Sequence, residues 1–372
     1  MQNREDHFNY FYGWWKNIDK SILLIVLSLF FLGLFFSLVS TSLIASDKLQ
    51  TNSYYFFIKH FIFVIIGLSF LFSFSIFNQN QLYNLSRILF LIFFLLLVLV
   101  PFIGVEVKGS KRWIDIFFLP RLQPIELLKP FLIVIIALVL NLGTNKNKYL
   151  NYFLSLLVIS PTVLLLLIQP DLGQSILVLL TWLILIFISG INLFIFFSFF
   201  FILIGSTSYL IFFIPKFEYI KTRIFSFLDP SSGNNYQSEK ASEAIIGGGF
   251  FGKGVGEGTL NNRIPEAHTD YIVSVISEEF GIIIVIAIIL VFIFFAFQVI
   301  KKISLEKDNK TRLILMGLIS ILILQTFVHI GVNIRILPTT GMTLPFLSYG
   351  GSSIISNAIL SGIILNLTRR KV

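Results

Sequence analysis

The sequence has no cysteine, only four histidines and few charged residues. Without thiols the chain can form no disulfide, no thiolate nucleophile and no cysteine-ligated zinc or iron–sulfur site. The histidines include no HxxxH pair, which argues against a zinc site. No GxSxG motif is present to indicate a serine hydrolase. Several common kinds of enzyme are therefore excluded or disfavoured by composition.

The shortage of charge predicts that most of the chain is surrounded by lipid. Charged residues make up 13% of the 372 residues and hydrophobic residues 56%, and the mean hydropathy is +0.89. A water-soluble protein needs a more polar surface than this composition provides. The formal net charge is +9. In a membrane protein this charge favours anionic lipid headgroups or a phosphate-bearing substrate as partners over nucleic acid.

Long apolar runs dominate the chain, and ten of them can cross a bilayer, because a spanning helix needs about 20 mainly apolar residues. The sequence therefore predicts an all-α polytopic membrane protein with about ten transmembrane helices and a large extracytoplasmic loop between the seventh and eighth. The runs cover 21–45, 55–77, 87–104, 125–143, 149–168, 172–190, 191–214, 271–300, 311–335 and 345–368.

The two chain ends are expected in the cytoplasm. An even number of spans places both on one side, and short loops on that side carry more Lys and Arg. The polar and aromatic start of the chain does not resemble a cleavable signal peptide. The expected division is an N-terminal tail, a transmembrane domain, an extracytoplasmic loop within it and a C-terminal tail, at 1–20, 21–368, 215–270 and 369–372.

Two polar segments interrupt the apolar pattern in the first half of the chain. One contains Lys111 and Arg112 in a hairpin, followed by Glu126 and Lys129 near the start of an apolar run. Residues three apart share a helix face, so Glu126 and Lys129 either hold helices together or serve a site, and both interpretations stay open. The other segment, 169–175, contains Asp171, which is expected to cap the next helix.

The long loop supplies further polar groups. Residues 238–246 are compatible with a short amphipathic helix at the membrane interface. The glycines that follow, 247–254, resemble a phosphate-binding loop but follow no predicted strand, so they are interpreted as allowing close approach to a membrane helix or a ligand. The basic residues Arg223, Lys253 and Arg263 predict an anionic ligand, with ordinary lipid headgroups as the alternative.

Two further segments are unusual. Residues 263–272 gather Arg263, Glu266, His268 and Asp270 immediately before an apolar run. Residues 333–353 interrupt a helical pattern with Pro and Gly, and irregular backbone at membrane depth is tolerated only where protein covers it or water fills a cavity. A cavity is therefore expected here. Taken alone, Asp270 is better explained as a helix cap of the eighth apolar run.

These polar and irregular segments, in this order, resemble the SEDS family of bacterial membrane proteins (shape, elongation, division and sporulation). The resemblance covers most of the chain, and residues 341–345 favour the division branch over the elongation branch. Ile125 departs from the pattern, since many members have a small hydroxyl residue there. The matching stretches are 111–113, 123–129, 169–173, 265–270, 278–281 and 345–353.

The resemblance implies a peptidoglycan glycosyltransferase that polymerises lipid II, a disaccharide-pentapeptide on undecaprenyl diphosphate. Asp270 matches the carboxylate that the family treats as essential and is the expected catalytic base. A divalent cation, Mg or Mn, is the candidate cofactor. The remaining expected substrate-binding residues are Lys111, Arg112, Glu126, Lys129, Arg223, Lys253, Arg263, Glu266, His268 and Ser348.

Two other functions compete with polymerisation. A lipid II flippase would also need a groove for a lipid and a basic site for diphosphate, but it would not need a base at Asp270. A scaffold that only recruits a division transpeptidase would tolerate loss of that carboxylate. The resemblance implies such a partner in any case, a class B penicillin-binding transpeptidase of the FtsI type, together with other divisome membrane proteins.

Overall fold

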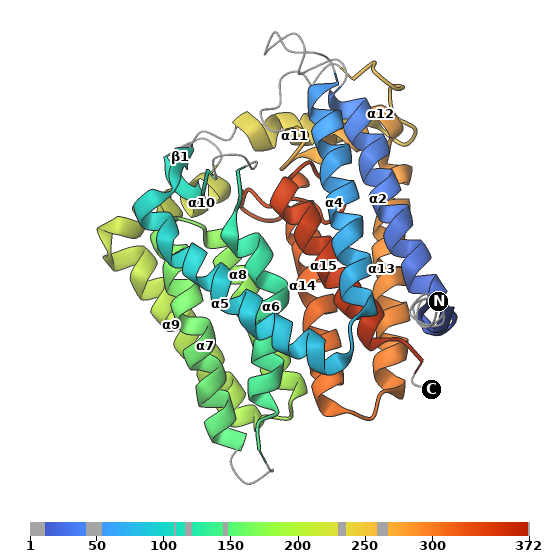
Figure 1. The fold of residues 1–372 in the computed structure, drawn as a ribbon. Coiled ribbons are helices and arrows are strands. Elements are labelled where there is room, and N and C mark those ends of the chain that lie inside the picture. Colours follow the sequence, from blue (N-terminus) through green and yellow to red (C-terminus); the bar gives the residue numbers. More distant parts are fainter. Residues whose placement is uncertain are drawn as a thin grey trace.

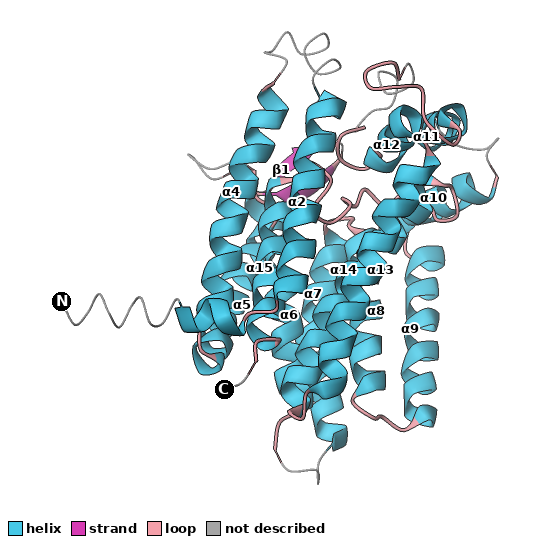
Figure 2. Ribbon diagram, turned by 90° about the vertical axis from the view of Figure 1, so that its right-hand side faces the viewer, coloured by secondary structure: helices cyan, strands magenta, loops and turns pink. Residues whose placement is uncertain are grey.

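The computed structural model describes residues 12–41, 54–107, 109–115, 121–143, 148–229, 236–258 and 267–370. Within these residues the chain is almost entirely helical, with one short antiparallel hairpin (Figures 1 and 2). The elements are α2 Lys20–Thr41, α4 Tyr55–Ile76, α5 Gln79–Ile103, β1 Val105–Val107, β2 Ser110–Trp113, α6 Pro124–Leu140, α7 Lys148–Ile168, α8 Leu172–Ile188, α9 Leu193–Phe213, η2 Pro215–Phe217, α10 Glu218–Leu228, α11 Tyr236–Gly248, α12 Ile272–Phe280, α13 Ile282–Leu305, α14 Asn309–Asn333 and α15 Gly351–Leu367.

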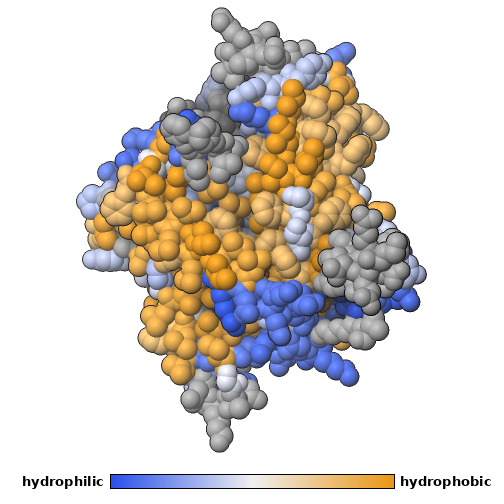
Figure 3. All heavy atoms as spheres, viewed as in Figure 1, coloured by the Kyte–Doolittle hydropathy of each residue, from blue (hydrophilic) through white to orange (hydrophobic). Residues whose placement is uncertain are grey.

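The predicted polytopic helical fold is confirmed. In the described part of the chain, seven helices are long and apolar enough to cross a membrane: α2, α4, α5, α7, α9, α13 and α14. The other expected runs correspond to α6, α8 and α15, which have 17 residues each. Apolar side chains cover most of the face seen in Figure 3, and hydrophilic ones gather near the termini and near β1 and α10.

The eighth expected run, 271–300, is wrong as a single helix. Two helices occupy it, α12 and α13, and Gly281 separates them with a φ of +81°. A side chain at Gly281 would collide with the carbonyl group of Phe250. The break therefore comes from a contact with the glycine-rich segment, and Asp270 precedes a short separate helix instead of the membrane span itself.

This break gives a stability prediction. Gly281→Ala should destabilise the protein more than Gly190→Ala, because both glycines have positive φ but only Gly281 has backbone against it. A residue other than glycine held at such a positive φ costs about 1–3 kcal/mol by itself, and the clash adds to it at Gly281. Thermal unfolding midpoints of the two purified variants check this, and equal losses would contradict it.

The centre of the bundle is formed by α6, α14 and α15, whose side chains are mostly buried. Helix α15 lies against α4 along a line of small residues. A Cβ at Gly67 would be 3.2 Å from that of Ala358, and one at Gly362 would be 2.6 Å from the carbonyl oxygen of Leu71. Small residues allow such close helix packing inside a membrane, where no hydrophobic force acts between helices. The tight packing fixes α15 against α4.

The end of the bundle away from the two termini carries the hairpin and the short helices α10, α11 and α12 (Figure 1). The expected helix at 238–246 is present within α11, and it packs on α12 because Gly248 lies against the Ser277 carbonyl. The backbone N–H groups of Lys253 and Gly254 donate to the carbonyl oxygens of Glu278 and Glu279, at 2.8 and 3.1 Å. These glycines do approach a helix closely, but the helix is the short α12 and not one of the candidate membrane spans.

Candidate active site

A cavity of about 300 Å³ lies at this end of the bundle. The start of α6, the start of α8 and the end of α14 border it, together with β2, α10 and the irregular segment 339–343. The first and last segments of the described chain meet at the other end, where the Arg370 N–H donates to the Asn17 carbonyl at 3.0 Å. The cavity that was predicted from the Pro and Gly residues in 333–353 is therefore present. Its lining residues come from segments spread over most of the chain.

Asp270 lines this cavity and is half-buried. Its carboxylate faces Gly341, where a Cβ would lie 3.5 Å from Oδ2. Gly341 has a φ of +71°, so a glycine both forms the turn and leaves space beside the carboxylate. The N-cap position of α12 belongs to Tyr271, and the alternative in which Asp270 caps the following helix is therefore not what the structure shows.

Buried hydrogen bonds fix the backbone around Asp270. The Asn333 Nδ2 group donates to the Asp270 carbonyl at 3.1 Å, and Asn333 Oδ1 accepts from the N–H and hydroxyl of Ser274 at 3.2 and 2.9 Å. The Ser348 hydroxyl donates to the Thr269 carbonyl at 2.6 Å and accepts from the Leu344 N–H at 2.8 Å. Ser348, an expected substrate ligand, does not line the cavity but holds the segment that carries Asp270.

Two guanidinium groups reach the same cavity. Arg112 forms an ion pair with Asp171 at 3.7 Å and donates to the carbonyl oxygens of Gln169 and Pro170. Arg223, on α10, makes no hydrogen bond or ion pair with the residues that the structure describes. Burial and the positive charge of Arg112 lower the pKa of Arg223 from its usual value. Because Arg223 has no such partner among the described residues, its charge is available to an anion in the cavity.

Asp171 acts as the expected helix cap, since it accepts from the Gln174 N–H at 3.4 Å at the start of α8. It also accepts from Gln123 Nε2 at 3.2 Å. Burial raises the pKa of the Asp171 carboxyl, and the nearby Arg112 charge opposes that rise. Asp171 therefore ties Arg112 to the helix starts that border the cavity.

Glu126 and Lys129 form the expected pair, and both are buried. Their side chains are 2.9 Å apart, and the second Glu126 oxygen accepts from Gln174 Nε2 at 2.6 Å. Lys129 donates to Gln325 Oε1 at 2.8 Å. The pair therefore links α6 to α8 and α14, as expected if it holds helices together. Glu126 also lines the cavity, so its role toward substrate stays a prediction.

Several expected site residues lie elsewhere. Lys111 is exposed on β2, and Lys253 pairs with the buried Glu278 at 2.8 Å. His268 packs its ring against Phe56 and Tyr349. None of these three lines the cavity. Two others, Arg263 and Glu266, lie outside the described residues.

Other residues of the cavity wall had not been expected as site residues. Gln237 on α11 and Tyr271 line it, as does Thr340 in the turn before Gly341. The irregular pattern of 333–353 pointed toward Thr340, but no feature of the sequence distinguished Gln237 from other loop residues. Among the described residues, no three His, Asp or Glu side chains come together as a ligand set for a metal. The divalent cation stays a prediction.

Comparison with known proteins identifies the family. The model of a family of cell cycle proteins, FtsW/RodA/SpoVE, matches residues 19–372. A probable peptidoglycan glycosyltransferase FtsW of Caulobacter vibrioides is 30% identical, with 96% of this chain and 91% of that protein covered. The protein of the same name from Coxiella burnetii is 35% identical, with 94% and 95% covered.

Solved structures agree with this assignment. A chain from a structure described as "Structural coordination of polymerization and crosslinking by a peptidoglycan synthase complex" superposes with a TM-score of 0.76 at 26% identity, covering 94% of this chain and 97% of that one. The rod shape determining protein RodA of Thermus thermophilus superposes at 0.69 with 24% identity and 94% and 96% coverage, which supports the fold alone. The expected SEDS resemblance is confirmed, and the chain belongs to the FtsW/RodA/SpoVE family of multi-pass membrane proteins.

Proposed function

We propose that this chain is a peptidoglycan glycosyltransferase that polymerises lipid II for septal wall synthesis in cell division. One observation carries the proposal: the Asp270 carboxylate and the guanidinium groups of Arg112 and Arg223 line a single cavity at one end of a membrane helix bundle. Relatives of nearly the same length are named probable peptidoglycan glycosyltransferases FtsW, which supports the same activity here.

The proposed reaction joins two lipid-linked sugars. A sugar hydroxyl is a weak nucleophile at neutral pH, so a positioned base must take its proton. As the acceptor GlcNAc 4-hydroxyl oxygen bonds to the anomeric carbon of the donor MurNAc, its proton passes to the Asp270 carboxylate. The bond from that carbon to the diphosphate oxygen breaks, and its electron pair leaves on the diphosphate. A positive charge next to that oxygen lowers the barrier.

The surroundings of Asp270 suit this role. Asn333 and Ser348 hold the Thr269–Asp270 backbone by hydrogen bonds to its carbonyl oxygens, so the carboxylate is carried by a rigid segment. Arg223 supplies a charge with no described partner. Arg112 contributes a second charge, although part of it is compensated by Asp171.

Arg223→Gln should lower the polymerisation rate by about 10²–10³-fold, the effect of removing one donor that stabilises a developing negative charge. Lys221→Gln is the matched control, because Lys221 lies on the same helix but outside the cavity wall, near the Phe225 ring. Lipid II consumption by the two purified variants measures the effect. Equal losses would show that α10 contributes only general surface charge.

The proposed orientation places both termini in the cytoplasm and the cavity at the outer face of the cytoplasmic membrane. The placement of the termini and the cavity at opposite ends of the bundle supports this arrangement. We further propose a class B penicillin-binding transpeptidase as partner. The similarity to a chain of a peptidoglycan synthase complex supports it.

The proposed function is tested by giving labelled lipid II to the purified protein together with its transpeptidase partner. Glycan polymer on a gel is the expected result. The same preparation in liposomes tests the flippase alternative. Transfer of labelled lipid II between leaflets without polymer would contradict a polymerase.

A further inference from the structure

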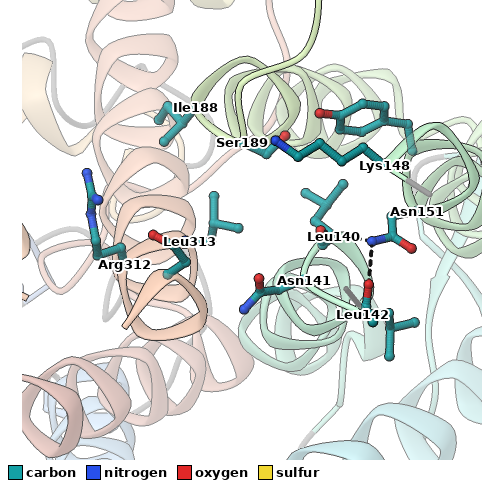
Figure 4. A pocket seen from close by; sticks show the side chains of 12 residues that line it. Leu140, Asn141, Leu142, Lys148, Asn151, Ile188, Ser189, Arg312 and Leu313 are labelled. Carbon is teal, nitrogen blue, oxygen red and sulfur yellow. Dashed lines mark hydrogen bonds between the residues drawn. The ribbon is translucent and has the colours of Figure 1, made fainter. Parts of the chain in front are cut away.

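A second cavity, of about 150 Å³, lies at the opposite end of the same helices (Figure 4). The last residues of α6 and α8 and the first residues of α7 and α14 line it. Because α6, α8 and α14 have their other ends at the cavity with Asp270, the two cavities are on opposite faces of the membrane bundle. The second one plays no part in the reaction proposed above.

The walls of this cavity are held by hydrogen bonds. Asn151 Nδ2 donates to the Leu142 carbonyl at 2.7 Å and to the Leu140 carbonyl at 3.4 Å, which fastens the end of α6 to α7. The Ser189 hydroxyl donates to the Ile186 carbonyl at 2.6 Å at the end of α8. The Asn151 bonds therefore join two of the elements that line the cavity, and the Ser189 bond closes the end of a third.

Two positive charges border this cavity, Lys148 on α7 and Arg312 on α14. Neither has a hydrogen bond or ion pair through its side chain with another residue in the part of the chain that the structure describes. The acid nearest in sequence to Arg312, Asp308, caps α14 by accepting from the Thr311 N–H and hydroxyl at 3.2 and 2.8 Å. In Figure 4, Lys148 extends toward Ser189, and Arg312 stands on the other side.

We propose that this second cavity binds the phosphate group of an anionic phospholipid headgroup. Basic pockets between transmembrane helices recognise such headgroups, and here two exposed cations from different helices line the cavity together with Asn141. The cavity is smaller than the roughly 300 Å³ lower limit for drug-sized ligands, which fits a headgroup phosphate better than a nucleotide or a disaccharide. In the proposed orientation the lipid belongs to the cytoplasmic leaflet.

A simpler role for the same charges is to offset the carboxyl-terminal dipoles of α6 and α8. That role requires no ligand, so a ligand titration separates the two. Full-length protein in an uncharged detergent is titrated with short-chain phosphatidylglycerol, phosphatidylcholine or inorganic phosphate, and its thermal midpoint is recorded. A ligand that binds only the folded state raises this midpoint with concentration.

We expect phosphatidylglycerol to raise the midpoint of the wild type, and phosphatidylcholine to have much less effect. The double variant Lys148→Gln/Arg312→Gln should lose the response, whereas Lys148→Arg/Arg312→Lys should keep it. Lys307→Gln/Lys310→Gln is the matched control, because it removes two exposed charges near the start of α14 that do not line the cavity. It should respond like the wild type.

An equal rise with inorganic phosphate would support the phosphate site and identify a free phosphate as its occupant. The proposal is overturned if Lys148→Gln/Arg312→Gln keeps the full response to phosphatidylglycerol. It is also overturned if the control variant loses the response equally, or if the wild type responds to none of the three compounds.

Discussion

Asp270→Asn is expected to lower the rate of lipid II polymerisation by about 10²–10⁴-fold, the usual contribution of a general base. The amide has nearly the shape of the carboxylate but cannot take a proton. The described bonds from Asn333 and Ser348 reach main-chain carbonyl groups, so the substitution leaves them in place. The variant should therefore fold normally and lose polymerisation activity.

Quantifying glycan product over time from purified protein with its partner gives the rate. Asp115→Asn serves as the control, because Asp115 is an exposed carboxylate near the hairpin that pairs with Arg121 at 3.5 Å and does not line the cavity. Its rate should equal that of the wild type. A scaffold needs no base at Asp270, so unchanged growth and complex formation with Asp270→Asn would favour that function.

Lys129→Met is expected to cost about 3–5 kcal/mol of folding free energy, the effect of leaving one charge of a buried ion pair alone. Glu126 would keep its bond from Gln174 but lose the only described cation within ion-pair distance, and Gln325 Oε1 would lose the Lys129 donor. Unfolding of the purified protein in detergent, followed by tryptophan fluorescence, measures the loss.

Helix α11 provides a matched comparison for this prediction. Lys240 and Glu243 have the same spacing of three residues, but they lie near the surface, with 23% and 50% of their side chains exposed. Surface pairs contribute about 0–1 kcal/mol, so Lys240→Met should be nearly neutral. The double variant Glu126→Leu/Lys129→Met should recover much of the stability, since it removes both buried charges. Similar losses for Lys129→Met and Lys240→Met would contradict the account of the pair.

The helical fold could be predicted from the sequence because a helix that crosses a bilayer needs about 20 mainly apolar residues, and such runs are easy to find. Each expected run overlaps a helix, and four of the six family stretches, 111–113, 123–129, 265–270 and 345–353, contribute residues to the cavity. The break at Gly281 could not be predicted in this way. It depends on the carbonyl of Phe250, a contact with a segment some thirty residues earlier that no local pattern reveals.

The basic residues show where prediction of the site stops. Lys111 and Arg112 are neighbours on β2, and successive strand residues point to opposite sides, so only Arg112 lines the cavity. Lys253 and Arg223 belong to the same loop, but Lys253 is paired with Glu278. A sequence gives the charges in a loop and does not give their partners, and the partners decide which cation is left for a substrate.

The central claim is that Asp270 acts on bound lipid II as a base, while Arg223 helps to hold its diphosphate. The most direct measurement compares lipid II binding and lipid II polymerisation in one preparation each of wild type and Asp270→Asn, with the transpeptidase partner present. The account predicts unchanged binding and lost polymerisation for Asp270→Asn. Polymerisation at the wild-type rate, or a loss of binding as large as the loss of rate, would contradict it.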